Sequence, residues 1–198
     1  MSIAAVRAGT VDLGLSQSMI LPQISMNSVP PSYVFSRTKA HETGGSCVVF
    51  RPQGNKIGTA GNEGIVKLWT LNLNSEYKSV KVSNGPVSCL NFNTTGELMA
   101  AGDNASQIAL IKIKPDLQIV EKFQGHKDIV NHCVFASEES KRLVSISQDH
   151  TMRIWDISRK TELKTSGFTS SCWALDIAKN DTRFATGHKT GEIKIWSL

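Results

Sequence analysis

The sequence lacks several features that mark large classes of proteins. None of its segments approaches the ~18 consecutive apolar residues of a membrane-spanning helix. It has four cysteines and no C-x-x-C pair, so we expect neither a zinc site nor another metal or cofactor. A Walker loop, a G-x-G-x-x-G stretch and the G-x-S-x-G turn of serine hydrolases are also missing. These absences favour a soluble protein without enzymatic activity.

Charge of one sign is not concentrated in any part of the chain. The 22 Lys and Arg residues are interspersed with 17 Asp and Glu residues, so the net charge of +5 forms no basic arm. We therefore expect no binding to nucleic acid, whereas mild attraction to an anionic membrane surface or an acidic partner is compatible with the charge. Residues 1–24 lack the basic start and long apolar core of a secretory signal, which indicates the cytosol or the nucleus.

What the sequence does contain is an internal repeat. One set of large apolar residues recurs at intervals of 42, 44 and 41 residues: Trp69, Ile111, Trp155 and Trp196. A second set recurs upstream at intervals of 42, 43 and 42 residues: Phe50, Phe92, Phe135 and Ile177. Because both sets share one period, we expect four copies of one structural unit, at about residues 38–71, 83–114, 125–158 and 168–198.

Each unit contains three short apolar alternations separated by polar turns. In the third unit these are "NHCVF", "RLVSIS" and a segment that ends at Trp155. Three strands joined by tight turns at this period are typical of a β-propeller blade, so the predicted fold class is all-β. The cysteines recur in the first strand of each unit, as small core residues would. Residues 1–28 show no sustained period, and we expect a flexible segment before a propeller region at 29–198.

The third unit resembles the WD40 repeat family. The matching residues are a "GH" pair at Gly125-His126, Ser145 in the second strand, Asp149 in the tight turn and a "WD" ending at Trp155-Asp156. The resemblance implies that His126, Ser145, Asp149 and Trp155 form a buried hydrogen-bonded chain that stabilises the blade. Such a chain is physically reasonable because each member supplies the partner that another needs.

The other units depart from this pattern. The departures lie at the histidine, turn and tryptophan positions: the first unit keeps His41 and Trp69 but has Asn62 and Glu63 at the turn, the second has Asn84 and Ile111, and the fourth keeps Trp196 but has Thr190. We therefore expect the third unit to have the most complete network of the four.

The surrounding sequence is similar to the propeller of the autophagy-related protein 16 family. The similar segments begin "VPPSYVFSRTKAHETGG" and "FTSSCWALDIAKNDTRFATGHKTG", and the second has Thr186-Gly187-His188 in place of the usual aspartate turn. The resemblance covers about residues 29–198. It implies a scaffold for protein–protein interactions that acts in autophagosome formation, where such scaffolds direct ubiquitin-like conjugation machinery to membranes.

The implied partners are that conjugation machinery or membrane-associated adaptors. The implied location is the cytoplasm, with peripheral association at autophagosomal or endolysosomal membranes. Residues 1–28 show neither the coiled coil nor the conjugate-binding helix of the family. The alternative is another WD40 adaptor, in vesicle coat assembly and trafficking or as a substrate receptor in ubiquitin ligation.

The number of repeats raises a question about closure. Propellers of this family are expected to have seven blades, and only four repeats are present. Four blades could close if residues 32–37 ("SYVFSR") supplied the outer edge of the last blade. Because a unit built for sevenfold geometry has the wrong angle for this, we expect an open partial propeller of four blades.

Partners of WD40 proteins often bind the narrow face that is lined by strand entries and tight turns. In the third repeat these positions hold Asn131 and Gln148, and in the fourth they hold Trp173 and Lys189. An aromatic residue beside a cation is typical of an interface hot spot, so Trp173 and Lys189 are the main candidates for protein binding. The alternative is that Trp173 is partly buried against a neighbouring blade.

Overall fold

A computed structural model describes residues 40–197, apart from residues 53, 72–75, 137–140 and 179–182. The described residues belong to one compact unit, Val34–Leu198. They form fifteen strands and no helix, and so contain no helical segment that could cross a membrane. The expectation of an all-β fold is therefore confirmed. The expectations for residues 1–28 and 32–37 lie outside the described residues.

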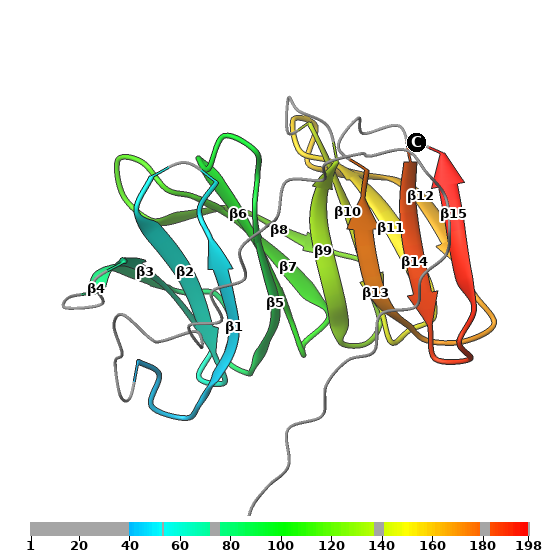
Figure 1. Cartoon of the computed structure of the whole chain (residues 1–198), viewed down its shortest axis with the longest axis horizontal. Coiled ribbons are helices and arrows are strands. Elements are labelled where there is room, and N and C mark those ends of the chain that lie inside the picture. Colours follow the sequence, from blue (N-terminus) through cyan, green and yellow to red (C-terminus); the bar gives the residue numbers. More distant parts are fainter. Residues whose placement is uncertain (1–39, 53, 72–75, 137–140, 179–182, 198) are drawn as a thin grey trace, which may run out of the picture. The chain divides into compact units, whose positions relative to one another are not determined.

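The strands form four antiparallel sheets that follow one another in the chain (Figure 1). The first sheet contains β1 (Gly45–Phe50), β2 (Lys56–Gly61), β3 (Ile65–Thr70) and β4 (Glu76–Lys81). The second contains β5 (Val87–Phe92), β6 (Leu98–Asp103), β7 (Gln107–Lys112) and β8 (Gln118–Gln124). The third contains β9 (Val130–Ala136), β10 (Arg142–Ser147), β11 (Thr151–Asp156) and β12 (Thr161–Gly167). The fourth contains β13 (Cys172–Ile177), β14 (Arg183–His188) and β15 (Ile193–Ser197).

The first strands of successive sheets are neighbours, with β1 against β5, β5 against β9 and β9 against β13. Figure 1 shows this order along the row of innermost strands. A simple up-and-down order with adjacent first strands is the arrangement of propeller blades. The expected blade architecture is therefore confirmed, with three strands in the described part of the fourth sheet.

The same tight turn joins the second and third strands of every sheet. In all four copies the turn residue five positions before the tryptophan position has a left-handed backbone: Gly64 (φ 77°), Ser106 (φ 67°), His150 (φ 63°) and Gly191 (φ 85°). A two-strand hairpin needs this conformation because it matches the twist of the strands. The repeat therefore extends to the backbone angles of the turns.

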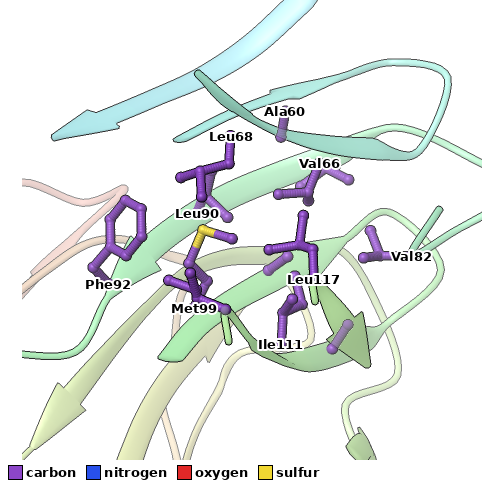
Figure 2. Packing of buried hydrophobic residues seen from close by; sticks show 13 residues of the cluster. Ala60, Val66, Leu68, Val82, Leu90, Phe92, Met99, Ile111 and Leu117 are labelled. Atoms are coloured by element: carbon purple, nitrogen blue, oxygen red, sulfur yellow. The ribbon is translucent and has the colours of Figure 1, made fainter. Parts of the chain in front are cut away.

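Apolar contacts between sheets build the core. For each sheet we call the face toward the preceding sheet the leading face and the face toward the next sheet the trailing face. Between the first and second sheets, the leading-face residues Leu90 and Phe92 pack into one cluster with Leu68 of the trailing face, as Figure 2 shows. Equivalent clusters lie between the second and third sheets and between the third and fourth sheets. All four cysteines are free thiols, and three of them are buried in these clusters.

Candidate functional site

In the third sheet the structure brings together His126, Ser145, Asp149 and Trp155. Trp155 Nε1 donates to Ser145 Oγ at 2.9 Å. Ser145 Oγ lies 2.7 Å from His126 Nε2, and His126 Nδ1 lies 3.0 Å from Asp149 Oδ2. The four side chains come from the loop before β9, from β10, from the turn after β10 and from β11. The chain of hydrogen bonds therefore ties the loop and the turn to the two central strands.

The direction of each hydrogen bond follows from the donors. The indole N–H of Trp155 can only donate, so Ser145 Oγ accepts it and gives its own proton to His126 Nε2. The proton of the imidazole then lies on Nδ1 and is donated to Asp149. Burial lowers the pKa of His126, although the hydrogen bond and charge of Asp149 act to raise it. His126 is therefore neutral at pH 7, as this chain of donors requires.

The Asp149 carboxylate is the end of this chain and accepts further hydrogen bonds. Its oxygens accept the backbone N–H of Lys127 at 2.9 Å, the backbone N–H of Thr151 at 2.9 Å and the Thr151 hydroxyl at 2.7 Å. Burial alone would raise the pKa of Asp149, but hydrogen bonds from Thr151, Lys127 and His126 outweigh it and lower the pKa to about 2. Asp149 thus holds the turn in place solely by accepting hydrogen bonds.

This combination of serine, histidine and aspartate is not arranged for hydrolysis. Ser145 is fully buried, and its hydroxyl both accepts from Trp155 and donates to His126. A nucleophilic serine must reach a substrate carbonyl with its oxygen free to attack. Ser145 has no such access, so these residues support a structural role.

Acid should destabilise the third sheet in two steps. Since burial depresses the pKa of folded His126 below its ordinary 6.5, the unfolded chain takes up that proton first, and stability falls as the pH falls below about 6.5. Since Asp149 has a pKa of about 2 when folded and an ordinary value of 3.8, stability falls again between about pH 4 and pH 2. Thermal unfolding over this pH range should show the lower step reduced in Asp149→Asn. Equal acid responses of the two proteins would contradict the assigned role of Asp149.

The first sheet carries an equivalent chain made from different residue types. Trp69 Nε1 donates to Thr59 Oγ1 at 2.8 Å, Thr59 Oγ1 lies 2.8 Å from His41 Nε2, and His41 Nδ1 lies 2.5 Å from Glu63 Oε1. Burial would raise the pKa of Glu63, but hydrogen bonds from His41 and Thr43 help to lower it. The first sheet therefore also has a complete chain of hydrogen bonds, whereas the sequence predicted the most complete network for the third sheet alone. Thr59 was missed and Glu63 was interpreted only as a departure at the turn, although both precede Trp69 at the spacings by which Ser145 and Asp149 precede Trp155.

The fourth sheet has a shorter chain of hydrogen bonds. Trp196 Nε1 donates to Thr186 Oγ1 at 2.9 Å, and Thr186 Oγ1 lies 3.0 Å from His188 Nε2. This histidine comes from β14, and Phe168 in the loop before β13 packs edge-on against it with ring centroids 4.6 Å apart. The buried Nδ1 atom of His188 has no hydrogen-bond partner among the described residues. The chain therefore stops at His188, where Thr190 replaces the aspartate of the third sheet.

The second sheet has apolar residues at these positions. Ala101 and Ile111 take the positions of the serine and the tryptophan, and both are buried. Asp103 fixes the turn instead, since its Oδ1 accepts the backbone N–H groups of Ala105 and Gln107. Asn84, expected at the histidine position, is exposed.

The first strand of each sheet has a β-bulge at the same place. The register shift leaves one residue without a direct cross-strand partner in each sheet: Ser46, Ser88, Asn131 and Trp173. Two of these side chains donate to the first strand of the next sheet, Ser88 to Val130 O at 2.5 Å and Asn131 to Cys172 O at 2.8 Å. The bulge therefore directs side chains toward the following sheet, and in the fourth sheet it presents Trp173.

The four residues predicted for protein binding have different surroundings. Gln148 Nε2 donates to Asn131 Oδ1 at 3.3 Å, so Asn131 and Gln148 are held by bonds within the protein. Trp173 is 59% exposed, and Lys189 is also exposed. Lys189 lies at the same end of the sheet as Trp173, because its backbone N–H donates to Ser171 O at 3.0 Å. Trp173 and Lys189 thus form an exposed rim on the fourth sheet.

Within the part of the chain that the structure describes, no group of three or more His, Cys, Asp and Glu side chains could hold a metal ion. The sulfur atoms of Cys89 and Cys133 lie 3.5 Å apart, but both residues are buried in the core.

Comparison with protein families explains the repeat. The family model for "WD domain, G-beta repeat" matches residues 117–156 and 160–197. These two segments are WD40 repeats. Each matched segment spans the outer strand of one sheet and the three inner strands of the next, so the WD40 sequence repeat is offset by one strand from the sheet. WD40 propeller domains generally act as protein-interaction scaffolds rather than catalysts, and the four sheets of this protein have the arrangement of such blades.

Known proteins resemble much of this chain. Autophagy-related protein 16 of Arabidopsis thaliana is 24% identical over 173 residues, which are 87% of this chain and 34% of that protein. Nuclear distribution protein nudF of Aspergillus niger is 26% identical over 164 residues, 81% of this chain and 37% of that protein. The solved structure of U3-55K matches with a TM-score of 0.72 and 20% identity, over 80% of this chain and 50% of that chain. The chain thus spans about a third to a half of the length of these proteins.

Proposed function

We propose that this protein is a non-catalytic scaffold that acts in autophagosome formation by binding other proteins at the rim of its fourth sheet. The observation that carries the proposal is the pair Trp173 and Lys189. At the equivalent bulge in the second and third sheets the side chain is hydrogen-bonded to the next sheet, whereas Trp173 is 59% exposed.

The chemistry of this rim favours an acidic peptide segment. The Trp173 ring offers a large apolar area with few rotatable bonds, which suits the centre of an interface. The Lys189 ammonium attracts carboxylate or phosphate groups, and the net charge of +5 acts in the same direction. Partners of this kind would be the conjugation machinery or its membrane-associated adaptors.

The similarity to autophagy-related protein 16 supports the autophagy role, together with the Thr186-Gly187-His188 segment that prompted it. A cytoplasmic location with peripheral association at autophagosomal or endolysosomal membranes follows from the same proposal. The second candidate is a WD40 adaptor in another process, such as vesicle trafficking or ubiquitin ligation. This second candidate is supported by nudF, which is as similar in sequence to this chain as autophagy-related protein 16 is.

The two rim residues should contribute differently to binding. Trp173→Ala should weaken binding at least tenfold, mainly by faster dissociation, because a large apolar contact is lost. Lys189→Ala should mainly slow association and reduce its dependence on salt. The measurement is capture of partners from cytosol, followed by binding kinetics of each captured protein at several salt concentrations.

Two matched variants control for general surface effects. Leu163 and Lys164 are exposed on β12 of the third sheet, so Leu163→Ala and Lys164→Ala should leave binding unchanged. Enrichment of autophagy proteins among the partners that Trp173→Ala loses would support the autophagy role, and enrichment of coat or ligase components would support the second candidate. If both rim variants retain every partner while melting normally, the rim is not the binding site.

A further inference from the structure

The turn that joins β14 to β15 in the fourth sheet (Figure 1) differs in charge from the matching turns of the first and third sheets. In those two sheets the residue six positions before the tryptophan is an acid, Glu63 or Asp149, and its carboxylate lies within 3.0 Å of the Nδ1 atom of the histidine. The fourth sheet has Thr190 at this position, with an exposed side chain. The position that supplies the anionic acceptor elsewhere therefore holds a neutral hydroxyl here.

His188 carries a donor that such an acceptor would satisfy. The indole N–H of Trp196 can only donate, so Thr186 Oγ1 accepts it and gives its own proton to His188 Nε2. The imidazole proton then lies on Nδ1, which is buried and has no hydrogen-bond partner among the described residues. Because a buried donor without an acceptor costs free energy, an acceptor added beside Nδ1 should stabilise the fourth sheet.

His188 and His126 reach equivalent hydrogen bonds by different routes. His126 comes from the loop before β9, whereas His188 comes from β14 itself. Both bond through Nε2 to the hydroxyl ten positions before the tryptophan, which belongs to Ser145 in the third sheet and to Thr186 in the fourth. In both histidines Nδ1 is thus the nitrogen that remains for an acceptor from the turn.

A second buried polar group lies beside the same turn. The backbone N–H of Lys189 donates to Ser171 O at 3.0 Å, which ties the turn to the loop before β13. The preceding residue of this loop, Ser170, has a buried hydroxyl that also lacks a partner among the described residues. Two such groups beside one turn favour an acceptor with several oxygen atoms.

The charges around the turn favour an anion. Lys189 is exposed and directly precedes the threonine. Lys194 Nζ lies 5.6 Å from the centre of the Phe168 ring, and this ring packs against His188. The Glu192 carboxylate would oppose an added anion, but it already pairs with Lys194 Nζ at 3.3 Å. An anion at the turn would therefore meet two lysines and one carboxylate.

We propose that Thr190 is a phosphorylation site and that its phosphate accepts the hydrogen bond of His188 Nδ1. In a protein kinase the Thr190 hydroxyl oxygen attacks the γ-phosphorus of ATP, the bond from this phosphorus to the departing ADP oxygen breaks, and the hydroxyl proton passes to a base of the kinase. Thr190 is exposed in a tight turn, so a kinase can reach it.

A phosphate on Thr190 suits this position in reach and charge. Its free oxygens lie one bond farther from the backbone than the carboxylate oxygens of an aspartate. They are three strong acceptors, and their charge of about −2 is attracted to Lys189. Phosphorylation would thus give the fourth sheet the anionic acceptor that Glu63 and Asp149 provide in the first and third sheets.

The first test is the stability of the full chain with phosphothreonine incorporated at position 190. The phosphate should raise the melting temperature by about 3–6 °C, because it gives a buried donor a charged acceptor. Phosphothreonine at position 161 is the matched control: Thr161 is also exposed and also follows a lysine, Lys160, but the histidine of its sheet already has Asp149 as its acceptor. The control should change the melting temperature by less than about 2 °C.

Two measurements assign the effect to His188. In a His188→Phe background, which lacks the donor, the phosphate at position 190 should raise the melting temperature by less than about 2 °C. In the parent chain, NMR should show that the His188 Nδ1 proton moves downfield and exchanges more slowly with water once the phosphate is present. An equal rise for the two phosphorylated positions, or an unchanged His188 signal, would overturn the proposal.

A further experiment identifies the source of the phosphate. After incubation of the full chain with ATP and a cytosolic extract, mass spectrometry should find phosphate on Thr190, and Thr190→Val should lack it. A large excess of inorganic phosphate without ATP should leave the His188 signal unchanged. A parent chain without phosphate on Thr190, or the same NMR response to inorganic phosphate alone, would rule out the modification. None of these readouts involves a partner protein, so they are independent of the proposed function.

Discussion

Replacing Asp149 with alanine is expected to lower the free energy of unfolding by about 2–4 kcal/mol. The substitution removes the charged acceptor of the buried His126 N–H and leaves only the Thr151 hydroxyl, 3.2 Å away, beside that donor. It also removes the acceptor of the backbone N–H groups of Lys127 and Thr151, which fix the loop before β9 and the turn before β11. Denaturant and thermal unfolding of the full chain would measure the change.

A matched aspartate separates this effect from the loss of any surface carboxylate. Asp116 pairs with Lys78 and is 68% exposed, so Asp116→Ala should change stability by less than about 1 kcal/mol. Glu63→Ala tests the chain of the first sheet in the same way, since Glu63 accepts from His41 and Thr43. If Asp149→Ala unfolds like Asp116→Ala, the hydrogen-bonded chain does not stabilise the third sheet.

The sequence was sufficient to predict the blades because a single period governs both the pattern and the packing. Strands, tight turns and the third-sheet chain follow from residue types at fixed distances from Trp155. The chain of the first sheet was overlooked because Thr59 and Glu63 differ in type from serine and aspartate. Their hydroxyl and carboxylate groups nevertheless offer the same donors and acceptors. In the first sheet, the distance of a residue from the tryptophan along the sequence was a better guide to its role than its residue type.

Other features depend on contacts between sheets, which the pattern of one repeat does not contain. His188 reaches Thr186 from the strand itself, so no histidine stands at the expected loop position. Asn131 is bound to the carbonyl of Cys172, although its position in the repeat is the same as that of the exposed Trp173. Ile195 alternates like its buried counterpart Leu110, and only the neighbouring sheet distinguishes the two.

Gly64→Ala is expected to destabilise the protein more than any surface change, by about 3–5 kcal/mol. Gly64 ends the tight turn of the first sheet with a φ of 77°, and an added Cβ would lie 2.1 Å from Ser83 O and 2.9 Å from Gly85 O. The Gly64 carbonyl also accepts hydrogen bonds from the backbone N–H groups of Val82 and Ser83. These bonds hold the segment that contains Ser83 close to the turn. Relief of the overlap requires movement of backbone, and the measurement is thermal unfolding of the full chain.

Gly191→Ala isolates the part of this effect that comes from the backbone angle. Gly191 holds the same turn position in the fourth sheet with a φ of 85°, and no atom lies within 4 Å of the site of its Cβ. The expected cost there is only that of a left-handed alanine, about 1–2 kcal/mol. His150 occupies the position in the third sheet with a φ of 63° and an exposed side chain, so the conformation itself tolerates a Cβ. Equal destabilisation by Gly64→Ala and Gly191→Ala would therefore mean that the Ser83 carbonyl moves away easily and that close packing of the turn contributes little.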